Sequence, residues 1–326
     1  MLTTPPIFSS KKADETRHPW MTIATATFNR ENEMRRLYKS MVELRLATKD
    51  EIVFEWIIVD DGSSDNTRDL VATWCEENKL PVKYYYQENR GKHIAINLAA
   101  DAAHGETFLT IDSDDELLPQ SVNVFHDTWF AIPEEVRRTL KGVTGRCISP
   151  HTRQILGTPL PKKINGGKYL ITSPQDLRYK YKIKGEMCGF NLTEIMRSYR
   201  LDINNKIGKY LPESILWGTI GMDYKEYVID VPVRIYNDDG NGAITEGSSK
   251  KRAPQNYYLW QFNVNNFLTK YLFSAPKDML KSVVGMSRDG FLTNRSISTI
   301  LKDCKGAFAK SMVLLFMPAG WILAKI

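Results

Sequence analysis

The sequence has few cysteines, and none of them stands at a metal-binding spacing. The four cysteines lie far apart, and no C-x-x-C motif or close cysteine–histidine pair occurs: Cys75, Cys147, Cys188 and Cys304. Structural zinc sites are built from closely spaced cysteine and histidine ligands. The cysteine pattern therefore argues against a zinc domain and favours a reducing cytoplasm.

Runs of basic residues are also absent. The chain has 44 Lys and Arg against 38 Asp and Glu, a net charge of +6, but no five basic residues are consecutive. This diffuse charge suits a phosphate-bearing ligand or an anionic surface and predicts no nucleic-acid partner. Residues 1–20 lack the continuous apolar core of a signal peptide, and we expect a polar N-terminal extension there.

Two glycine-rich nucleotide fingerprints are missing as well. No G-x-G-x-x-G follows any predicted strand, and the segments NRGKH and NGGKY have neither the spaced glycine nor the hydroxyl of a P-loop. These absences weigh against a dehydrogenase and against an ATPase. Another kind of nucleotide site has to be considered.

Strand-like and helix-like segments alternate through the first half of the chain. Strands are predicted at residues 21–27, 54–61, 82–88 and 107–114, and helices at 31–44, 64–78 and 92–103. This alternation predicts an α/β fold with a mostly parallel sheet flanked by helices. Further strands are expected at 143–149 and 225–237, and residues from 255 onward read mainly as helix.

Polar side chains follow three of these strands. They are Asn29 and Arg30, Asp60 and Asp61, and Asp112 and Asp114. Ligands of such sheets bind beyond the carboxyl ends of the strands. In LTIDSDDELLP, residues 109–119, an apolar strand runs directly into four acids, and two carboxylates at i and i+2 suit a hard divalent cation. The alternative for an isolated D-x-D pair is a solvated turn.

Four motifs resemble those of a known family. TATFNRE, WIIVDDGSSDNT, QENRGKHIAINLAADAAHGE and LTIDSDDELLP, in this order and spacing, resemble family-2 glycosyltransferases of the GT-A fold. The motifs cover about residues 22–119. The second half is similar to bacterial members more loosely, through KGEMCGF, YLPESILWG and VPVRIYN. The resemblance implies a GT-A catalytic domain at 21–250, with a nucleotide-sugar half at 21–119 and an acceptor half at 120–250. It does not extend to the last sixty or so residues, and the helical extension at 251–326 is expected from the residue pattern alone.

The resemblance also implies roles for individual residues. Around the donor nucleotide it places Thr27, Asn29, Arg30, Asp60, Asp61, Lys92, Asp112 and Ser113. In this assignment Asp61 binds the base, and Asp114 holds Mn²⁺ or Mg²⁺ on the diphosphate. Asp112 contacts either the ribose side of the nucleotide or the same metal ion. Asp115 and Glu116 are interpreted as caps of the following helix. The structural alternatives are a plain turn for VDDGSSD and a solvated lysine for Lys92.

A catalytic base is expected outside the D-x-D loop, because an inverting enzyme places it across the sugar from the leaving group. Glu213 is chosen because it opens a short helical pattern, where the helix N-terminus keeps a carboxylate ionised. Glu186 and Asp223 remain alternatives. Glu186 is otherwise assigned to an acceptor contact, and Trp217 either stacks on a sugar ring or packs in the core.

The C-terminal stretch 312–324 is the most apolar of the chain, yet it is too short for a membrane span and contains Pro318. Apolar residues at helical spacing predict a stripe on one helix: Ile297, Ile300, Leu301, Cys304, Phe308, Met312 and Leu315. With Lys302, Lys305 and Lys310 nearby, this helix would lie on an anionic membrane surface. The alternatives are packing on the protein's own sheet or on a partner in a homo-oligomer.

Together these features predict a metal-dependent inverting glycosyltransferase. It would use a nucleotide-sugar donor, UDP-linked by preference, and a glycan acceptor, polyprenyl-diphosphate-linked, in cell-surface polysaccharide synthesis. The expected location is cytoplasmic, at the inner face of the cell membrane. The alternatives are a sugar-phosphate nucleotidyltransferase, which would need a glycine-rich loop that TATFNRE lacks, and a non-catalytic nucleotide-sugar-binding module.

Overall fold

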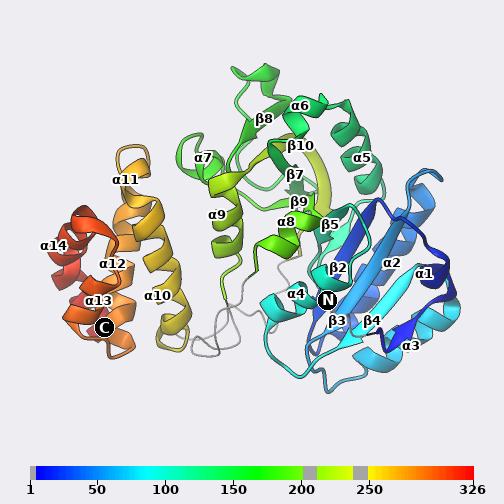
Figure 1. Cartoon of the computed structure of the whole chain (residues 1–326), viewed down its shortest axis with the longest axis horizontal. Coiled ribbons are helices and arrows are strands. Elements are labelled where there is room, and N and C mark those ends of the chain that lie inside the picture. The colour runs from blue at the N-terminus through cyan, green and yellow to red at the C-terminus, as the bar shows by residue number, and fades with distance from the viewer. Residues whose placement is uncertain (1–4, 201–210, 238–248) are drawn as a thin grey trace. The chain divides into compact units, whose positions relative to one another are not determined.

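The computed structural model describes residues 5–200, 211–237 and 249–326. The chain divides into two compact units (Figure 1). The first comprises Met1–Pro174, Ile183–Asp202 and Thr219–Asp239, and the second comprises Gln175–Lys182, Ile203–Gly218 and Gly240–Ile326. Parts of the predicted acceptor half, residues 201–210 and 238–248, lie outside the described residues. The domain boundaries inferred from the sequence stay predictions.

A ten-stranded sheet organises the first unit, as far as the described residues show. Its strands follow the order β1 (Phe8–Ser9), β4 (Val82–Tyr86), β3 (Phe54–Asp60), β2 (Met21–Thr27), β5 (Thr107–Thr110), β9 (Met187–Leu192), β7 (Leu140–Ile148), β10 (Lys225–Ile235) and β6 (Glu116–Leu117), with β8 (Tyr169–Thr172) pairing to β10.

The strands predicted in the first half form a parallel block. β4, β3, β2 and β5 pair in parallel, and Thr27, Asp60 and Tyr86 stand in register at their carboxyl ends. Beyond β5 the sheet is mixed, because β9 pairs antiparallel with both β5 and β7 while β7 and β10 are parallel. The α/β fold with flanking helices is thereby confirmed.

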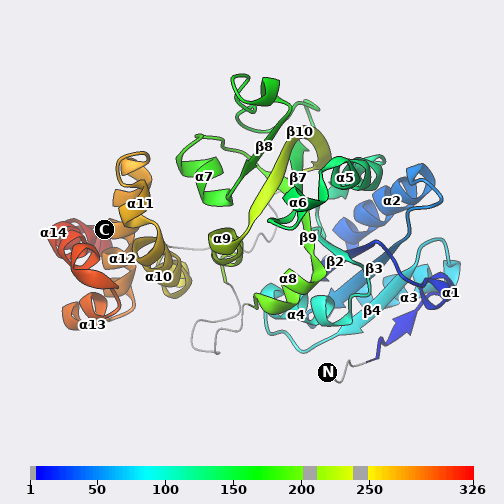
Figure 2. The ribbon, with the colours of Figure 1, turned by 45° about the horizontal axis from the view of Figure 1, so that its top comes forward.

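Helices cover the sheet of this unit. They are α1 (Lys11–Glu15), α2 (Glu31–Ala47), α3 (Thr67–Glu77), α4 (Lys92–Ala102), α5 (Ser121–Ala131), α6 (Glu134–Arg137) and α8 (Thr193–Ser198), with a short 3₁₀ turn at Asn165–Gly167. In α2 the apolar side chains at i, i+3 and i+4 spacing are buried: Met34, Leu37, Met41 and Leu44. The small residues Ala95 and Ala99 let α4 pack closely on β2 and β3, and α8 lies beside it (Figure 2).

The second unit is helical. It contains most of α7 (Pro174–Tyr179), the start of α9 (Ser214–Asp223), and α10 (Ser249–Asn266), α11 (Leu268–Tyr271), α12 (Pro276–Leu292), α13 (Ile297–Lys302) and α14 (Gly306–Lys325). Its core is a separate apolar cluster that includes Tyr257, Met279, Val283 and Val313. The prediction of helix from residue 255 onward is confirmed for this segment.

The predicted single apolar stripe at the C-terminus is wrong in its geometry. The predicted stripe is divided between two helices, α13 and α14. Gly306, the first residue of α14, adopts a φ of +81°, a value that favours glycine. On α14 the buried positions are Ala309, Val313, Met317 and Gly320, which face α12, whereas Leu315 of the predicted stripe is exposed. α14 is 20 residues long, so by length and composition it could cross a membrane, which is weak evidence on its own.

Candidate functional site

The first part of the site is a pair of linked turns at the carboxyl edge of the parallel block. Asn29, after β2, has a φ of +51°, a conformation that asparagine tolerates better than most residues. Its backbone N–H donates to Ser63 Oγ at 2.9 Å, and its Oδ1 accepts from the Ser64 N–H at 2.7 Å. The turns after β2 and β3 are therefore tied together. Thr27, at the end of β2, is buried, and its hydroxyl has no hydrogen-bond partner among the described residues.

Asp60 and Asp61 are both buried, and both organise backbone. Asp60 accepts from the Ser63 N–H at 2.7 Å and from the Tyr84 hydroxyl at 2.7 Å. Burial, followed by the hydrogen bond to Asp60, raises the pKa of Tyr84, so its proton stays in place.

Asp61 fixes the segment between β4 and α4. Its Oδ1 accepts from Gln87 Nε2 at 2.7 Å and from the Arg90 N–H at 2.8 Å, and its Oδ2 accepts from the Gly91 N–H at 2.8 Å. Gly91 has a φ of +103°, which a residue with a side chain rarely adopts. Asp61 thus shapes the loop that starts α4, and its predicted contact with a nucleotide base stays a prediction.

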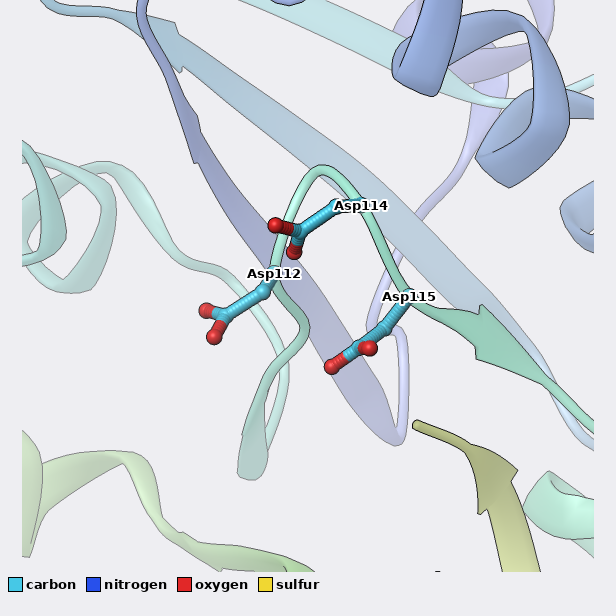
Figure 3. A group of neighbouring side chains, drawn as sticks. All are labelled: Asp112, Asp114 and Asp115. Carbon is cyan, nitrogen blue, oxygen red and sulfur yellow. The ribbon is translucent and has the colours of Figure 1, made fainter. Parts of the chain in front are cut away.

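A cluster of three carboxylates follows β5. One carboxylate oxygen from each of Asp112, Asp114 and Asp115 lies within 4.8 Å of the others. Figure 3 shows the three side chains close together around this turn, so the turn concentrates negative charge. Ser113 lies between the first two acids and is buried.

Two cations from neighbouring helices face this cluster. Lys92, the first residue of α4, places its Nζ 2.5 Å from Asp112 Oδ1, and Arg30, before α2, places Nη1 3.7 Å from Asp114 Oδ2. Burial acts to raise the pKa of Asp112, but the charges of Lys92 and then Arg234 outweigh it and hold that pKa below its usual value. For Asp114, burial and the charge of Asp112 raise the pKa despite Arg30.

Asp115 faces the opposite side, toward β10. It is 1% exposed, its Oδ1 accepts from the Asn237 N–H at 2.9 Å, and its Oδ2 lies 3.2 Å from Arg234 Nη1. Burial raises the pKa of Asp115 to about 7, although Arg234 opposes the shift. The interpretation of Asp115 and Glu116 as helix caps is wrong, because α5 has Gln120 at its N-cap and Glu116 belongs to β6.

Arg234 extends the site and was missed at the sequence level. Besides Asp115 it contacts Cys147 Sγ through Nε at 3.2 Å and Glu186 Oε2 through Nη2 at 3.8 Å. Arg234 therefore connects the acid cluster to one of the two predicted acceptor residues. The only signal was its position in VPVRIYN, a motif quoted for its resemblance but given no role.

The acid cluster meets a simple test for a cation site. Asp115 Oδ2 is a buried acceptor that receives no hydrogen bond from the described residues, although Arg234 lies nearby. Buried carboxylate oxygens usually find a partner, and three clustered carboxylates are the donor set that Mg²⁺ and Mn²⁺ prefer. The residues present thus fit a divalent cation.

The remaining predicted residues lie at α9. Glu213 directly precedes α9, is half-buried and falls in the second unit, and its carbonyl oxygen accepts from the Trp217 N–H at 3.0 Å. Trp217 is also half-buried. Asp223, the other candidate base, ends α9 in the first unit and accepts from the Tyr199 hydroxyl at 2.7 Å. The roles of Glu213 and Trp217 stay predictions.

Comparison with known proteins gives consistent results. The family described as glycosyl transferase family 2 matches residues 22–131. An uncharacterized glycosyltransferase of Synechocystis sp. is 28% identical over 127 residues, which are 38% of this chain and 39% of that protein. A validoxylamine A glucosyltransferase of Streptomyces hygroscopicus subsp. limoneus is 34% identical over 77 residues, 24% of this chain and 16% of that protein.

The crystal structure of S. aureus TarS 1-349 in complex with UDP-GlcNAc matches at a TM-score of 0.55 and 14% identity, over 94% of this chain and 90% of that chain. The curated relatives match over less than two fifths of either chain, and the structural match shows a shared fold. The matched segment 22–131 contains both linked turns, the loop before α4 and the acid cluster. Residues 22–131 of this chain therefore match glycosyl transferase family 2, and the chain has the GT-A fold of its structural neighbours.

Proposed function

We propose that this protein is a metal-dependent glycosyltransferase that moves a sugar from a nucleotide-diphosphate donor to a hydroxyl of a glycan acceptor. The observation that carries the proposal is the acid cluster Asp112, Asp114 and Asp115, which lies at the carboxyl edge of the parallel block inside the matched segment. That edge is where α/β sheets bind nucleotides. The relative named as a validoxylamine A glucosyltransferase supports the reaction class.

Asp112, Asp114 and Asp115 would hold the cation, Mn²⁺ or Mg²⁺. When bound, such a cation supplies Lewis-acid stabilisation of the charge that develops on a diphosphate leaving group. Lys92 and Arg30 keep the cluster from being uniformly negative, which eases the approach of a dianionic donor.

UDP is the preferred nucleotide of the proposal, because the TarS structure that shares this fold holds UDP-GlcNAc. Thr27 and the turns at Asn29, Asp60 and Asp61 would border the nucleotide. The unpartnered Thr27 hydroxyl supports this placement, since a buried hydroxyl usually makes a hydrogen bond.

The base of an inverting reaction would be Glu213, at the start of α9. Glu186 is the alternative with independent support, because Arg234 lies 3.8 Å from its carboxylate and 3.2 Å from Asp115. A general base takes the proton from the acceptor hydroxyl and is commonly worth about 10²–10⁴-fold in rate. The acceptor contacts of Glu186 and Trp217 belong to the same proposal.

The surface of α14 supports the proposed acceptor and location. Exposed apolar side chains gather on this helix: Leu314, Leu315, Trp321, Ile322 and Leu323. Lys325 Nζ lies 4.0 Å from the centre of the Trp321 ring. An aromatic and basic helix face of this kind suits the interface of an anionic membrane. A membrane-bound enzyme at the cytoplasmic face would meet a polyprenyl-diphosphate-linked glycan there, in polysaccharide biosynthesis. A homo-oligomer is the competing use of the same face.

The test is turnover of purified full-length protein with UDP-, GDP- and dTDP-sugars, in the presence of Mn²⁺ and then with excess EDTA. We expect hydrolysis or transfer with a UDP-sugar that EDTA abolishes. Pyrophosphate formation from a nucleoside triphosphate and a sugar phosphate would identify a nucleotidyltransferase instead. Binding of a nucleotide-sugar without turnover on any acceptor would identify the protein as a non-catalytic binding module.

Asp114→Ala should abolish the metal-dependent turnover while the protein stays folded, because the change removes a carboxylate at a partly exposed turn and no core packing. The matched control is Asp127→Ala, which removes an exposed acid that pairs with Lys49 elsewhere on the first unit. Near wild-type rates for Asp114→Ala at limiting Mn²⁺ would overturn the metal assignment.

A further inference from the structure

The helical second unit contains a hollow of about 250 Å³ that the proposed transfer chemistry does not use. Helix α10 supplies most of its lining, with Tyr258, Gln261, Phe262, Asn265 and Asn266, and Ile215 of α9 and Lys305 supply the rest. Pockets for drug-sized ligands measure roughly 300–1,000 Å³, so this hollow suits a single small ring. We call it the amide pocket.

The amide side chains of the pocket are held in place by backbone. Asn265 donates to the Asp303 carbonyl at 2.9 Å and accepts from the Lys305 N–H at 2.7 Å. Gln261 donates to the same Asp303 carbonyl at 3.3 Å, and Asn266 donates to the Phe262 carbonyl at 2.8 Å. In Gln261 and Asn266 the side-chain nitrogen is the bonded end, so the side-chain oxygen faces away from the carbonyl that holds it.

Hydrogen-bonding capacity is left over inside this fixed frame. The side-chain oxygens of Gln261 and Asn266, and the hydroxyl of Tyr258, make no hydrogen bond to any described residue. An apolar ligand would leave these groups unpaired, at a cost in binding. The pocket therefore favours a ligand that carries several hydroxyl groups.

Two aromatic rings and Ile215 supply the apolar part of the lining. Phe262 packs edge-to-face on Phe267, with ring centres 5.3 Å apart at 84°, and Tyr258 packs in the same way on Tyr257 at 6.1 Å. These contacts restrict both rings. Rigid aromatic faces beside polar groups can pack on the C–H face of a pyranose while amides bind its hydroxyls.

The charge of the pocket argues against a nucleotide or another polyanion. No carboxylate lines it, and Lys305 is its only cation, as far as the described residues show. The Asp303 carboxylate is engaged elsewhere, by the Tyr257 hydroxyl at 2.8 Å and by Arg295 at 3.6 Å. A diphosphate would need more positive charge than a single exposed lysine provides.

We propose that the amide pocket binds one neutral sugar residue of a glycan, as a binding site distinct from the acid cluster. The proposal does not depend on catalysis, since it concerns residues of the second unit alone. Gln261 and Asn266 accept hydrogen bonds from sugar hydroxyls, and Tyr258 and Phe262 pack on the ring.

The experiment is saturation-transfer difference NMR on the full-length protein, with methyl β-glucoside and N-acetylglucosamine as neutral probes and glucuronate as the anionic probe. Spectra are recorded without nucleotide and again with UDP and Mg²⁺ in excess, which fill the donor site. We expect saturation transfer to at least one neutral probe, with a weaker response for glucuronate. Gln261→Leu should weaken that binding about tenfold, and Tyr258→Leu should do the same.

The matched control is Asn256→Leu, which changes an amide on the same helix outside the pocket lining. Thermal unfolding of each variant identifies any that fails to fold. If Gln261→Leu or Tyr258→Leu fails to fold, the other of the two variants tests the proposal. Three results would overturn the proposal: no transfer to either neutral sugar, transfer that UDP abolishes, or equal binding by wild type and both pocket variants. Binding of neutral sugars to the amide pocket is expected even if the protein shows no glycosyltransferase activity.

Discussion

Asp112 and Asp115 of the acid cluster have pKa values shifted in opposite directions, although the two residues are close in sequence. Lys92 lies against Asp112 and favours its ionised form, whereas burial raises the pKa of Asp115 to about 7. Arg234 offsets part of that burial without restoring a normal value. The cluster therefore holds a proton near neutral pH that a bound cation must displace.

This proton gives a pH-dependent prediction. Below pH 7 Asp115 is protonated and competes with a cation, and above pH 7 it is ionised, so cation binding should strengthen as pH rises. One group with this pKa makes the affinity for Mn²⁺ about tenfold weaker at pH 6 than at pH 8. Calorimetric titration with Mn²⁺ at both pH values measures it. Asp115→Asn should flatten the dependence, and an unchanged wild-type affinity would contradict it.

A second residue-scale prediction separates the two candidate bases. Glu213→Gln should lower kcat about 10²-fold or more with little change in donor affinity, because glutamine keeps the shape and removes the proton acceptor. Glu186→Gln is the paired variant, since Arg234 contacts this carboxylate. A nearly silent Glu213→Gln beside an inactive Glu186→Gln would move the base to Glu186. Steady-state rates with the donor found active give the comparison.

Among the elements, α14 has one side that is buried in the second unit and another that is exposed. Val313 and Met317 are buried in the core of the second unit, while Leu315 is 69% exposed and Ile322 54% exposed. Removing residues 311–326 would therefore strip α12 of its cover as well as the exposed face. Surface substitutions separate these two effects.

We expect Leu315→Ser with Ile322→Ser to reduce binding to phosphatidylglycerol liposomes about tenfold or more, because each loses apolar contact with the membrane. The matched control is Leu46→Ser, which changes a leucine that is 82% exposed on the first unit. Co-sedimentation measures the bound fraction. Wild-type protein that stays in the supernatant, or a double variant that sediments like wild type, would show that this face does not bind membranes.

At the scale of the whole molecule, hydrogen bonds link four separate loops. The turns after β2 and β3 are joined through Asn29, Asp61 fixes the loop before α4, and Lys92 joins that loop to the turn after β5. A ligand held by one loop should therefore order the others.

Hydrogen exchange with UDP and Mn²⁺ should show this coupling. We expect slower exchange of amides in residues 61–66, 87–92 and 111–116 together, with no comparable change in α12 or α13. The ligand binds only the folded site, and at 100 times its Kd it stabilises that state by about 2.7 kcal/mol. Mass spectrometry of peptic fragments resolves these segments. Protection confined to one loop would show that the loops do not act as one site.

Local patterns in the sequence were sufficient for the parallel block and for the positions of its polar residues. The apolar strands and the i, i+3, i+4 spacing of α2 depend on residues close in the chain, and parallel strands bring their carboxyl ends to one edge. Asp60, Asp61, Asp112 and Asp114 were located in this way. Their motifs also identified the family.

Only the tertiary structure decided which partners these residues meet. Asn237 and Arg234 reach Asp115 because β10 pairs with β6, a contact across 122 residues that no local pattern encodes. The raised pKa of Asp115 follows from that burial. The division of α14 into buried and exposed sides likewise depends on α12, which packs against one side of it. Sequence periodicity specifies that a helix has an apolar face, and packing determines how much of that face is covered.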